Sequence, residues 1–291
     1  MSDTQDSEAP KKGSKAELGQ ANNASDLNET AKVETFDATD AGQKEAEPKK
    51  TFKARFIEET KFFSGLALVM LTLLTGVWGH FKIPSESMLP TLEVGDHLYV
   101  SKFAYGYSKH SLPFGLHRIP GLPEGKILSR LPKRGDVAVF RNPSAGIIMI
   151  KRVIGLPGDE IRTLRGRLYI NGAIVERKMI DSYLYREHEG LKTGVDVYEE
   201  QWPEEKHPHQ IYEKTDFGPL DNTEVFKVPD DHIFFMGDNR DNSTDSRDPR
   251  GPGYVPLDHL IGRADLMMFS FKRCEKEEEL RCPPFRALKP L

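Results

Sequence analysis

The chain has 291 residues, of which 30% are charged, and a formal net charge of −4. This length predicts one or two domains with a real hydrophobic core. Without a basic face or a nucleic-acid motif, the composition excludes a nucleic-acid-binding protein, so no nucleic acid is expected among its partners.

Metal and cofactor sites are not indicated by the cysteines and histidines. The two cysteines, Cys274 and Cys282, lack paired C-x-x-C spacing, and the nine histidines form no H-E-x-x-H motif. We therefore expect neither a metal nor a cofactor. Whether the two cysteines form a disulfide depends on the compartment, which the pattern alone leaves open.

The first 60 residues contain few large apolar side chains, which predicts a disordered tail. Residues 61–81 are uncharged from 62 to 79 and mostly apolar, and about 18 such residues would span roughly 27 Å as a helix. The segment predicts one transmembrane helix; a buried core helix is the alternative. Several cations precede it, so the positive-inside rule places the tail in the cytoplasm and the rest outside.

Residues 82–291 have the pattern of a mainly β domain. Asn171-Gly172 lies between two alternating runs and predicts a hairpin. Residues 176–227 are polar and rich in Tyr and Glu, which indicates an inserted subdomain away from a catalytic core at 82–175 and 228–272. Five further runs rich in β-branched and apolar residues predict strands at 97–103, 136–142, 147–156, 232–236 and 264–271.

Two serines, Ser85 and Ser87, follow the apolar segment and are bracketed by Pro84 and Pro90. Proline removes a donor and restricts the preceding residue, so this stretch cannot be helix interior. The serines are therefore presented on an irregular backbone. On its own, the stretch favours an ordinary surface loop with two solvated hydroxyls.

Lys151 and Arg152 interrupt a near-continuous apolar strand at 147–156. Side chains alternate along a strand, so one of the two should point inward and the other away. An inward lysine can lose its proton and become a general base, which requires a pKa shift of about 3 units, or about 4 kcal/mol. The alternative is that Lys151 extends to solvent from a strand edge.

A dense turn of short hydrogen-bonding side chains occupies residues 237–248, directly after a predicted strand. Such a turn can satisfy backbone groups locally and orient a neighbouring amine or hydroxyl. A calcium loop is the competing interpretation, but its spacing fails, because the glycine at the sixth position and the closing glutamate are both missing.

Together these segments resemble bacterial type I signal peptidases, the Ser-Lys dyad serine endopeptidases that remove signal peptides from exported preproteins. The resemblance covers about residues 82–271, in matching order. It implies an antiparallel β catalytic domain with an inserted subdomain, and cleavage after small residues at an A-x-A type site. The matching motifs lie at residues 83–92, 95–96, 102–106, 134–136, 150–159 and 237–247.

The resemblance also implies roles for individual residues. Ser87 matches the nucleophile and Lys151 the general base. The Ser85 hydroxyl matches the oxyanion-hole donor, together with the Ser87 backbone N–H. Ser243 matches the residue that orients the base. The supporting residues of the turn are Asp238, Arg240, Asp245 and Arg247.

The same match implies that the substrate binds in shallow apolar pockets that exclude bulky side chains. Met149 stands where many relatives carry an aromatic residue, and one predicted span stands where many relatives have two. The residues implied to line these pockets are Phe81, Ile83, Pro84, Met88, Leu92, Leu98, Val139, Met149 and Ile150.

The expected partners are the signal peptides of preproteins, the lipid bilayer and the secretion translocon. The expected location is the bacterial cytoplasmic membrane, with a cytoplasmic N-terminus and the catalytic domain on the periplasmic face. The apolar loop at 112–116 is expected to enter the lipid interface. A non-catalytic, membrane-anchored binding or assembly protein is the alternative. A Ser-Lys self-cleaving repressor would need a DNA-binding helix pair where the apolar segment lies.

Overall fold

The computed structural model describes residues 51–112, 115–187, 190–202, 208–270, 280–281 and 286–291. The predictions for the tail up to residue 50, for Cys274 and Cys282, and for the tip of the 112–116 loop lie outside the described residues.

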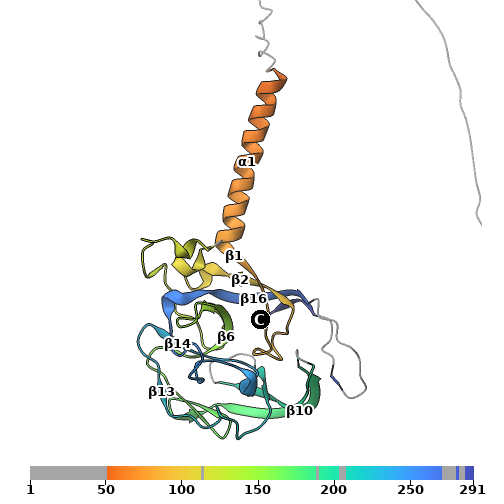
Figure 1. The fold of residues 1–291 in the computed structure, drawn as a ribbon, viewed down its shortest axis with the longest axis vertical. Helices are drawn as coiled ribbons and strands as arrows, with labels where there is room; N and C mark the ends of the chain where they lie inside the picture. The colour runs from red at the N-terminus through yellow and green to blue at the C-terminus, as the bar shows by residue number, and fades with distance from the viewer. Residues whose placement is uncertain (1–50, 113–114, 188–189, 203–207, 271–279, 282–285) are drawn as a thin grey trace, which may run out of the picture. The chain divides into compact units, whose positions relative to one another are not determined.

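An antiparallel sheet of eight strands forms the centre of the fold, in the order β1-β2-β16-β5-β6-β14-β15, with β17 pairing to β16. All five predicted strand runs lie in this sheet, which confirms the mainly β class. Figure 1 shows β16 crossing above β6 and β14. The strands are β1 (Trp78–Lys82), β2 (Asp96–Ser101), β5 (Val137–Arg141), β6 (Ile148–Gly155), β14 (His232–Met236), β15 (Val255–Pro256), β16 (Leu260–Ser270) and β17 (Ala287–Pro290).

Three smaller sheets and five short 3-10 helices complete the described part of the domain. The predicted hairpin is confirmed: Asn171 and Gly172 have φ angles of 52° and 78°, as the tight turn between β8 and β9 requires. One sheet contains β10 (Glu176–Arg186), β11 (Lys192–Gln201) and β12 (His209–Glu213). Another contains β13 (Phe226–Lys227), β7 (Glu160–Leu164), β8 (Arg167–Ile170) and β9 (Ala173–Ile174). The rest are β3 (Tyr107–Ser108), β4 (Lys126–Ile127), η1 (Lys102–Ala104), η2 (Lys109–Ser111), η3 (Leu116–Arg118), η4 (Arg240–Asn242) and η5 (Leu257–His259).

A single α-helix, α1 (Phe52–Val77), precedes the sheet in the described residues. The helix predicted at 61–81 is wrong at both ends. It begins earlier, and it stops where Trp78–Lys82 pairs antiparallel with β2, because interstrand hydrogen bonds replace helical ones there. Within the described ranges, no helix combines the length and apolar character that are needed to cross a membrane.

The central strands are buried on both faces, which explains their continuous apolar runs. On β5, Val137 and Val139 pack into one apolar cluster while Ala138 and Phe140 pack into another. The expectation that only one of Lys151 and Arg152 points into the protein is wrong. They are 3% and 6% exposed, because β6 lies between β5 and β14 with protein on both sides.

The segment predicted as an insertion contacts the 237–248 turn directly, so the expectation that it lies away from the catalytic core is wrong. Glu200 on β11 accepts two hydrogen bonds from the Arg240 guanidinium. The Tyr212 amide on β12 donates to the Asp238 carbonyl at 2.8 Å. Buried charges require partners, and Arg240 finds its partner in the insertion. The domain bounds at 176 and 227 stay a prediction.

Replacing Glu200 with glutamine should destabilise the protein by about 3–5 kcal/mol, because Arg240 is left as an uncompensated buried charge. Glu199→Gln, next to it on the same strand but half-buried, should change the free energy of unfolding by less than about 0.5 kcal/mol. Denaturant unfolding of the two variants measures the difference. Equal stabilities would show that the Glu200–Arg240 pair does not hold the insertion to the turn.

Candidate active site

Ser87 lies in the irregular segment between β1 and β2, as its flanking prolines predict. Backbone hydrogen bonds close the ends of this segment, from the Ile83 amide to the Asp96 carbonyl at 2.9 Å and from the Gly95 amide to the Ile83 carbonyl at 2.8 Å. The Ser87 carbonyl accepts a hydrogen bond from the Asn239 amide at 3.1 Å. The turn at 237–248 therefore positions the serine.

Lys151 lies on β6, opposite Ala138 of β5. Its Nζ donates a hydrogen bond to Ser87 Oγ, which is buried and 64 positions earlier in the sequence. The next pair along β6 joins Arg152 to Met236 of β14, the last residue before the turn. The sheet thus brings the lysine, the serine loop and the turn to one place.

Burial lowers the pKa of Lys151 to about 8, against the opposing effect of Asp245 and Asp238. The amine is enclosed by protein, so its charged form loses hydration that these carboxylates replace only in part. A substantial fraction of the Lys151 side chains is therefore neutral slightly above neutral pH. A neutral amine next to a hydroxyl can accept its proton.

Arginines neutralise both neighbouring carboxylates. Arg152 contacts Asp238 through two nitrogens, at 2.7 and 2.6 Å. Arg247 does the same to Asp245, at 3.0 and 2.9 Å. Burial alone would raise the pKa of each carboxyl, but the paired guanidinium holds it below its ordinary value. Because these negative charges are already paired, they stabilise a charged Lys151 less than free carboxylates would.

Ser85 lies on the solvent side of Ser87, with 3.4 Å between the two hydroxyl oxygens. Ser85 is exposed while Ser87 is buried. The structure therefore brings together Ser85, Ser87 and Lys151 from two distant segments.

Ser243 does not make the predicted hydrogen bond to Lys151. Its buried Oγ has no hydrogen-bond partner among the described residues. The hydroxyl packs against Gly237, where any Cβ would collide with Ser243 Oγ and with the Ser87 carbonyl. Gly237 therefore allows the turn to approach the serine loop closely, and the Lys151 amine points to Ser87 instead.

Most residues predicted to contact substrate belong to a packed core. Met149 packs against a neighbouring cluster, and Pro84 is exposed. An apolar core and an apolar pocket wall require the same residue types, so sequence cannot separate them. The seven others share one apolar cluster: Phe81, Ile83, Met88, Leu92, Leu98, Val139 and Ile150.

Arg152, Thr91 and Asn239 have roles at the site that the sequence reasoning missed. Thr91 Oγ1 donates to Asp238 at 2.5 Å, and the Asn239 side-chain amide donates to the Glu86 carbonyl at 3.2 Å. One signal could have found Arg152. An arginine in a strand with two buried faces requires an acidic partner, and the turn at 237–248, directly after a predicted strand, contains four aspartates.

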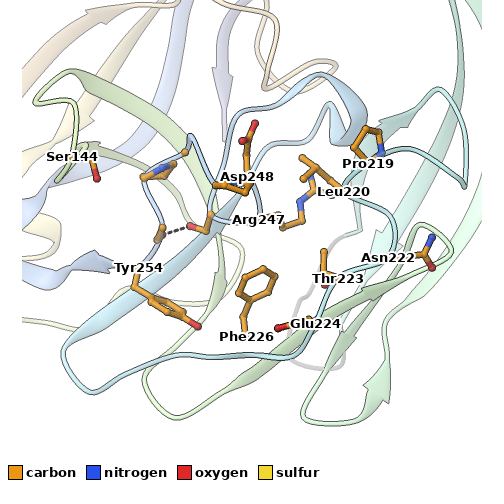
Figure 2. Close-up of a pocket in the computed structure, with 15 residues that line it drawn as sticks. Ser144, Pro219, Leu220, Asn222, Thr223, Glu224, Phe226, Arg247, Asp248 and Tyr254 are labelled. Atoms are coloured by element: carbon orange, nitrogen blue, oxygen red, sulfur yellow. Dashed lines mark hydrogen bonds between the residues drawn. The ribbon is translucent and has the colours of Figure 1, made fainter.

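A separate hollow of about 520 Å³ lies beside the far end of the turn and contains neither Ser87 nor Lys151. Figure 2 shows Arg247 and Asp248 on one side of it, with Thr223, Phe226 and Tyr254 opposite. In this lining, the Arg247 guanidinium pairs with Asp245 and donates to the Arg240 carbonyl.

Known proteins match this chain over most of its length. A family model described as "Signal peptidase, peptidase S26" matches residues 56–269. The chain belongs to this family. Signal peptidase I of Pseudomonas aeruginosa is 39% identical over 74% of this chain and 73% of that protein. Signal peptidase I of Rickettsia typhi is 37% identical over 77% of this chain and 82% of that protein.

Membership of the peptidase S26 family makes the chain a hydrolase of the serine endopeptidase class. Among solved structures, a signal peptidase I from Enterococcus faecalis V583 is 25% identical and covers 46% of this chain and 97% of its own. The TM-score of that match is 0.27.

Replacing Lys151 with methionine should stabilise the protein while removing its amine. The pKa of Lys151 is lowered from 10.5 to about 8, so below pH 8 the folded protein carries a buried charge at a cost of up to about 3 kcal/mol. That cost is relieved as the pH rises from about 8 to 10.5, where the unfolded lysine is also neutral. The gain in melting temperature should therefore be largest below pH 8 and should disappear above pH 10.5.

Thermal unfolding at several pH values measures this gain. Arg152→Met, the neighbouring residue, is the matched control and should instead destabilise at every pH in this range, because it leaves Asp238 unpaired. A Lys151→Met variant that is less stable than the parent at pH 7 would contradict the argument that the amine is held at a cost.

Proposed function

We propose that this chain removes N-terminal signal peptides from exported preproteins, with Ser87 as the nucleophile and Lys151 as the general base. The observation that carries the proposal is the buried hydrogen bond between Lys151 Nζ and Ser87 Oγ. The lowered pKa of Lys151 and the membership of the signal peptidase family support it.

In this mechanism, neutral Lys151 takes the Ser87 proton as Oγ attacks the scissile carbonyl carbon. The oxyanion that forms accepts hydrogen bonds from the Ser85 hydroxyl and the Ser87 N–H, and such a donor is typically worth about 3–4 kcal/mol in the transition state. Protonated Lys151 then gives its proton to the leaving amine. Lys151, neutral again, then takes a proton from water as the water oxygen attacks the acyl ester. It returns that proton to the Ser87 oxygen as the ester bond breaks, which frees Ser87.

The charged residues of the turn hold this geometry and do no chemistry in the proposal. Asp238 and Arg240 fasten the turn to β6 and to the insertion. Asp245 accepts the Gly237 amide at 3.0 Å and pairs with Arg247. Ser243, next to the Ser87 carbonyl, would orient the lysine only after its hydroxyl turns towards the amine.

Cleavage after small residues is part of the same proposal. The apolar cluster beside the serines is already packed, with Met88, Leu92 and Leu98 fully buried. A substrate side chain that docks against this surface would enter only a shallow depression. Alanine, with a single methyl group, fits such a surface, and a larger side chain would require the core to move.

Ser87→Ala and Lys151→Ala should each lower kcat/KM for a preprotein by more than about a thousandfold, because each removes one half of a unit that acts together. In the parent protein, kcat/KM should rise about tenfold per pH unit below the apparent pKa, and level off above about pH 8, as Lys151 loses its proton. Gel-based cleavage of a preprotein in detergent measures both results.

Lys126→Met is the matched control. Burial also lowers the pKa of Lys126 to about 8, but its Nζ donates to the Leu257 carbonyl at 2.8 Å and contacts no serine in the described residues. This variant should keep the parent activity and the parent pH profile. Full activity of Lys151→Ala, or a profile that moves in Lys126→Met, would refute the assignment of Lys151.

We also propose the lipid bilayer as a partner, through α1. Large apolar side chains are exposed along this helix, among them Phe62, Phe63, Leu66 and Val69. Apolar surface of this extent is unfavourable in water and is covered in lipid. A location at the bacterial cytoplasmic membrane, with the catalytic domain on its outer face, belongs to this proposal. The secretion translocon stays a predicted partner.

A triple variant with Phe62→Ser, Leu66→Ser and Val69→Ser should float with phosphatidylcholine vesicles several-fold less than the parent. The reason is that the three side chains share one helix face. Glu59→Gln, a polar exchange on the same helix, should float as the parent does. Flotation after dilution from detergent measures the bound fraction. Equal flotation of the triple variant and the parent would remove α1 as the lipid contact.

A further inference from the structure

Two short helices outside the Ser87–Lys151 site bring three possible metal ligands together. His110 lies on η2, and Asp258 and His259 lie on η5. Each offers one ligand atom, and these atoms all lie within 4.8 Å of one another. The His110 and His259 rings are 4.4 Å apart between centroids and tilted by 40°, so the two imidazoles lie directly beside each other. His117 lies further off, with 6.3 Å between its ring centroid and that of His110.

His110 is 9% exposed, and neither of its ring nitrogens has a hydrogen-bond partner among the described residues. Leaving a buried polar group unpaired costs about 1–3 kcal/mol. A capping box holds the backbone around it. The Ser108 side chain accepts a hydrogen bond from the His110 amide at 3.2 Å, and the Ser111 side chain accepts one from the Ser108 amide. The backbone around His110 therefore holds in place a buried ring whose nitrogens are unpaired among the described residues.

His259 has the orientation of a metal ligand. Its Nδ1 lies 3.0 Å from the Arg141 carbonyl oxygen, which can only accept, so Nδ1 carries the proton. Nε2 is left with its lone pair directed away from that carbonyl. Metal-binding histidines commonly use one ring nitrogen for the metal and donate from the other to a carbonyl or carboxylate.

Groups near the His110 imidazole both lower and raise its pKa. Burial is the main cause that lowers the pKa of His110 to about 4. The His259 ring, Arg141 and Lys109 act in the same direction, and the Asp258 carboxylate opposes them. Asp258 is the only carboxylate of the three clustered side chains.

We propose that His110, Asp258 and His259 bind a divalent transition metal of the zinc class. Two imidazole nitrogens and one carboxylate are a donor set that zinc prefers, whereas calcium and magnesium take oxygen ligands. A tetrahedral zinc with bonds of about 2.0–2.1 Å needs ligand atoms about 3.4 Å apart, so small side-chain rotations close the set. The fourth position is left for water or another ligand. The site would join η2 to η5, and it departs from the expectation of no metal drawn from sequence motifs.

Titration of the untagged full chain, stripped with a chelator and kept in detergent, tests the proposal. Calorimetry should show one equivalent of Zn²⁺, and Co²⁺ in its place should give the visible absorption of a tetrahedral site that Zn²⁺ abolishes. His110→Gln and His259→Gln should each weaken Zn²⁺ binding at least tenfold. His232→Gln is the control, since His232 lies on β14 and its Nδ1 is 2.7 Å from the Asp230 carbonyl. This variant should bind as the parent does.

Asp258→Asn keeps the shape of the side chain and guards against variants that fail to fold. Zn²⁺ should raise the melting temperature of the parent and of His232→Gln, and raise it much less in Asp258→Asn. No binding at one equivalent by the parent, or unchanged affinity in all three ligand variants, would overturn the proposal. Neither readout uses peptidase activity, so the result is independent of the proposed function.

Discussion

The burial of one amine beside one hydroxyl is the constraint on which the rest of the site depends. A lysine is kept near neutral only where water is excluded and nearby carboxylates are already paired. β6 supplies the first condition, because β5 and β14 flank it and protein covers both of its faces. In this buried position, Lys151 Nζ donates a hydrogen bond to the Ser87 hydroxyl.

The second condition is met by three buried ion pairs of the turn. Arg152 pairs with Asp238, Arg240 with Glu200, and Arg247 with Asp245. Arg152 and Arg247 neutralise the two carboxylates that would otherwise stabilise the charged lysine. The Arg152–Asp238 pair joins the turn to β6 and the Arg240–Glu200 pair joins it to the insertion, while Arg247 and Asp245 pair within the turn. The Asn239 amide, which donates to the Ser87 carbonyl, connects the turn to the serine loop. Structure and electrostatics of the site therefore depend on the same residues.

Local patterns predicted much of this arrangement. β-branched runs predicted the central strands, Asn171-Gly172 predicted its hairpin, and the motifs singled out Ser87 and Lys151. Alternation along a strand failed for Arg152, because a strand buried on both faces has no outward side. The insertion was placed too far away, since no local pattern shows that Glu200 is the partner of Arg240.

The sequence by itself determined which residue types could do the chemistry and where irregular backbone presents them, because propensity, proline and motif spacing act over a few neighbouring residues. Only the tertiary structure decided which groups meet. Ser87 and Lys151 are 64 positions apart, and their contact depends on strand register. The gathering of His110 with His259 depends in the same way on long-range packing. Burial and pKa are properties of that packing, so no local pattern could supply them.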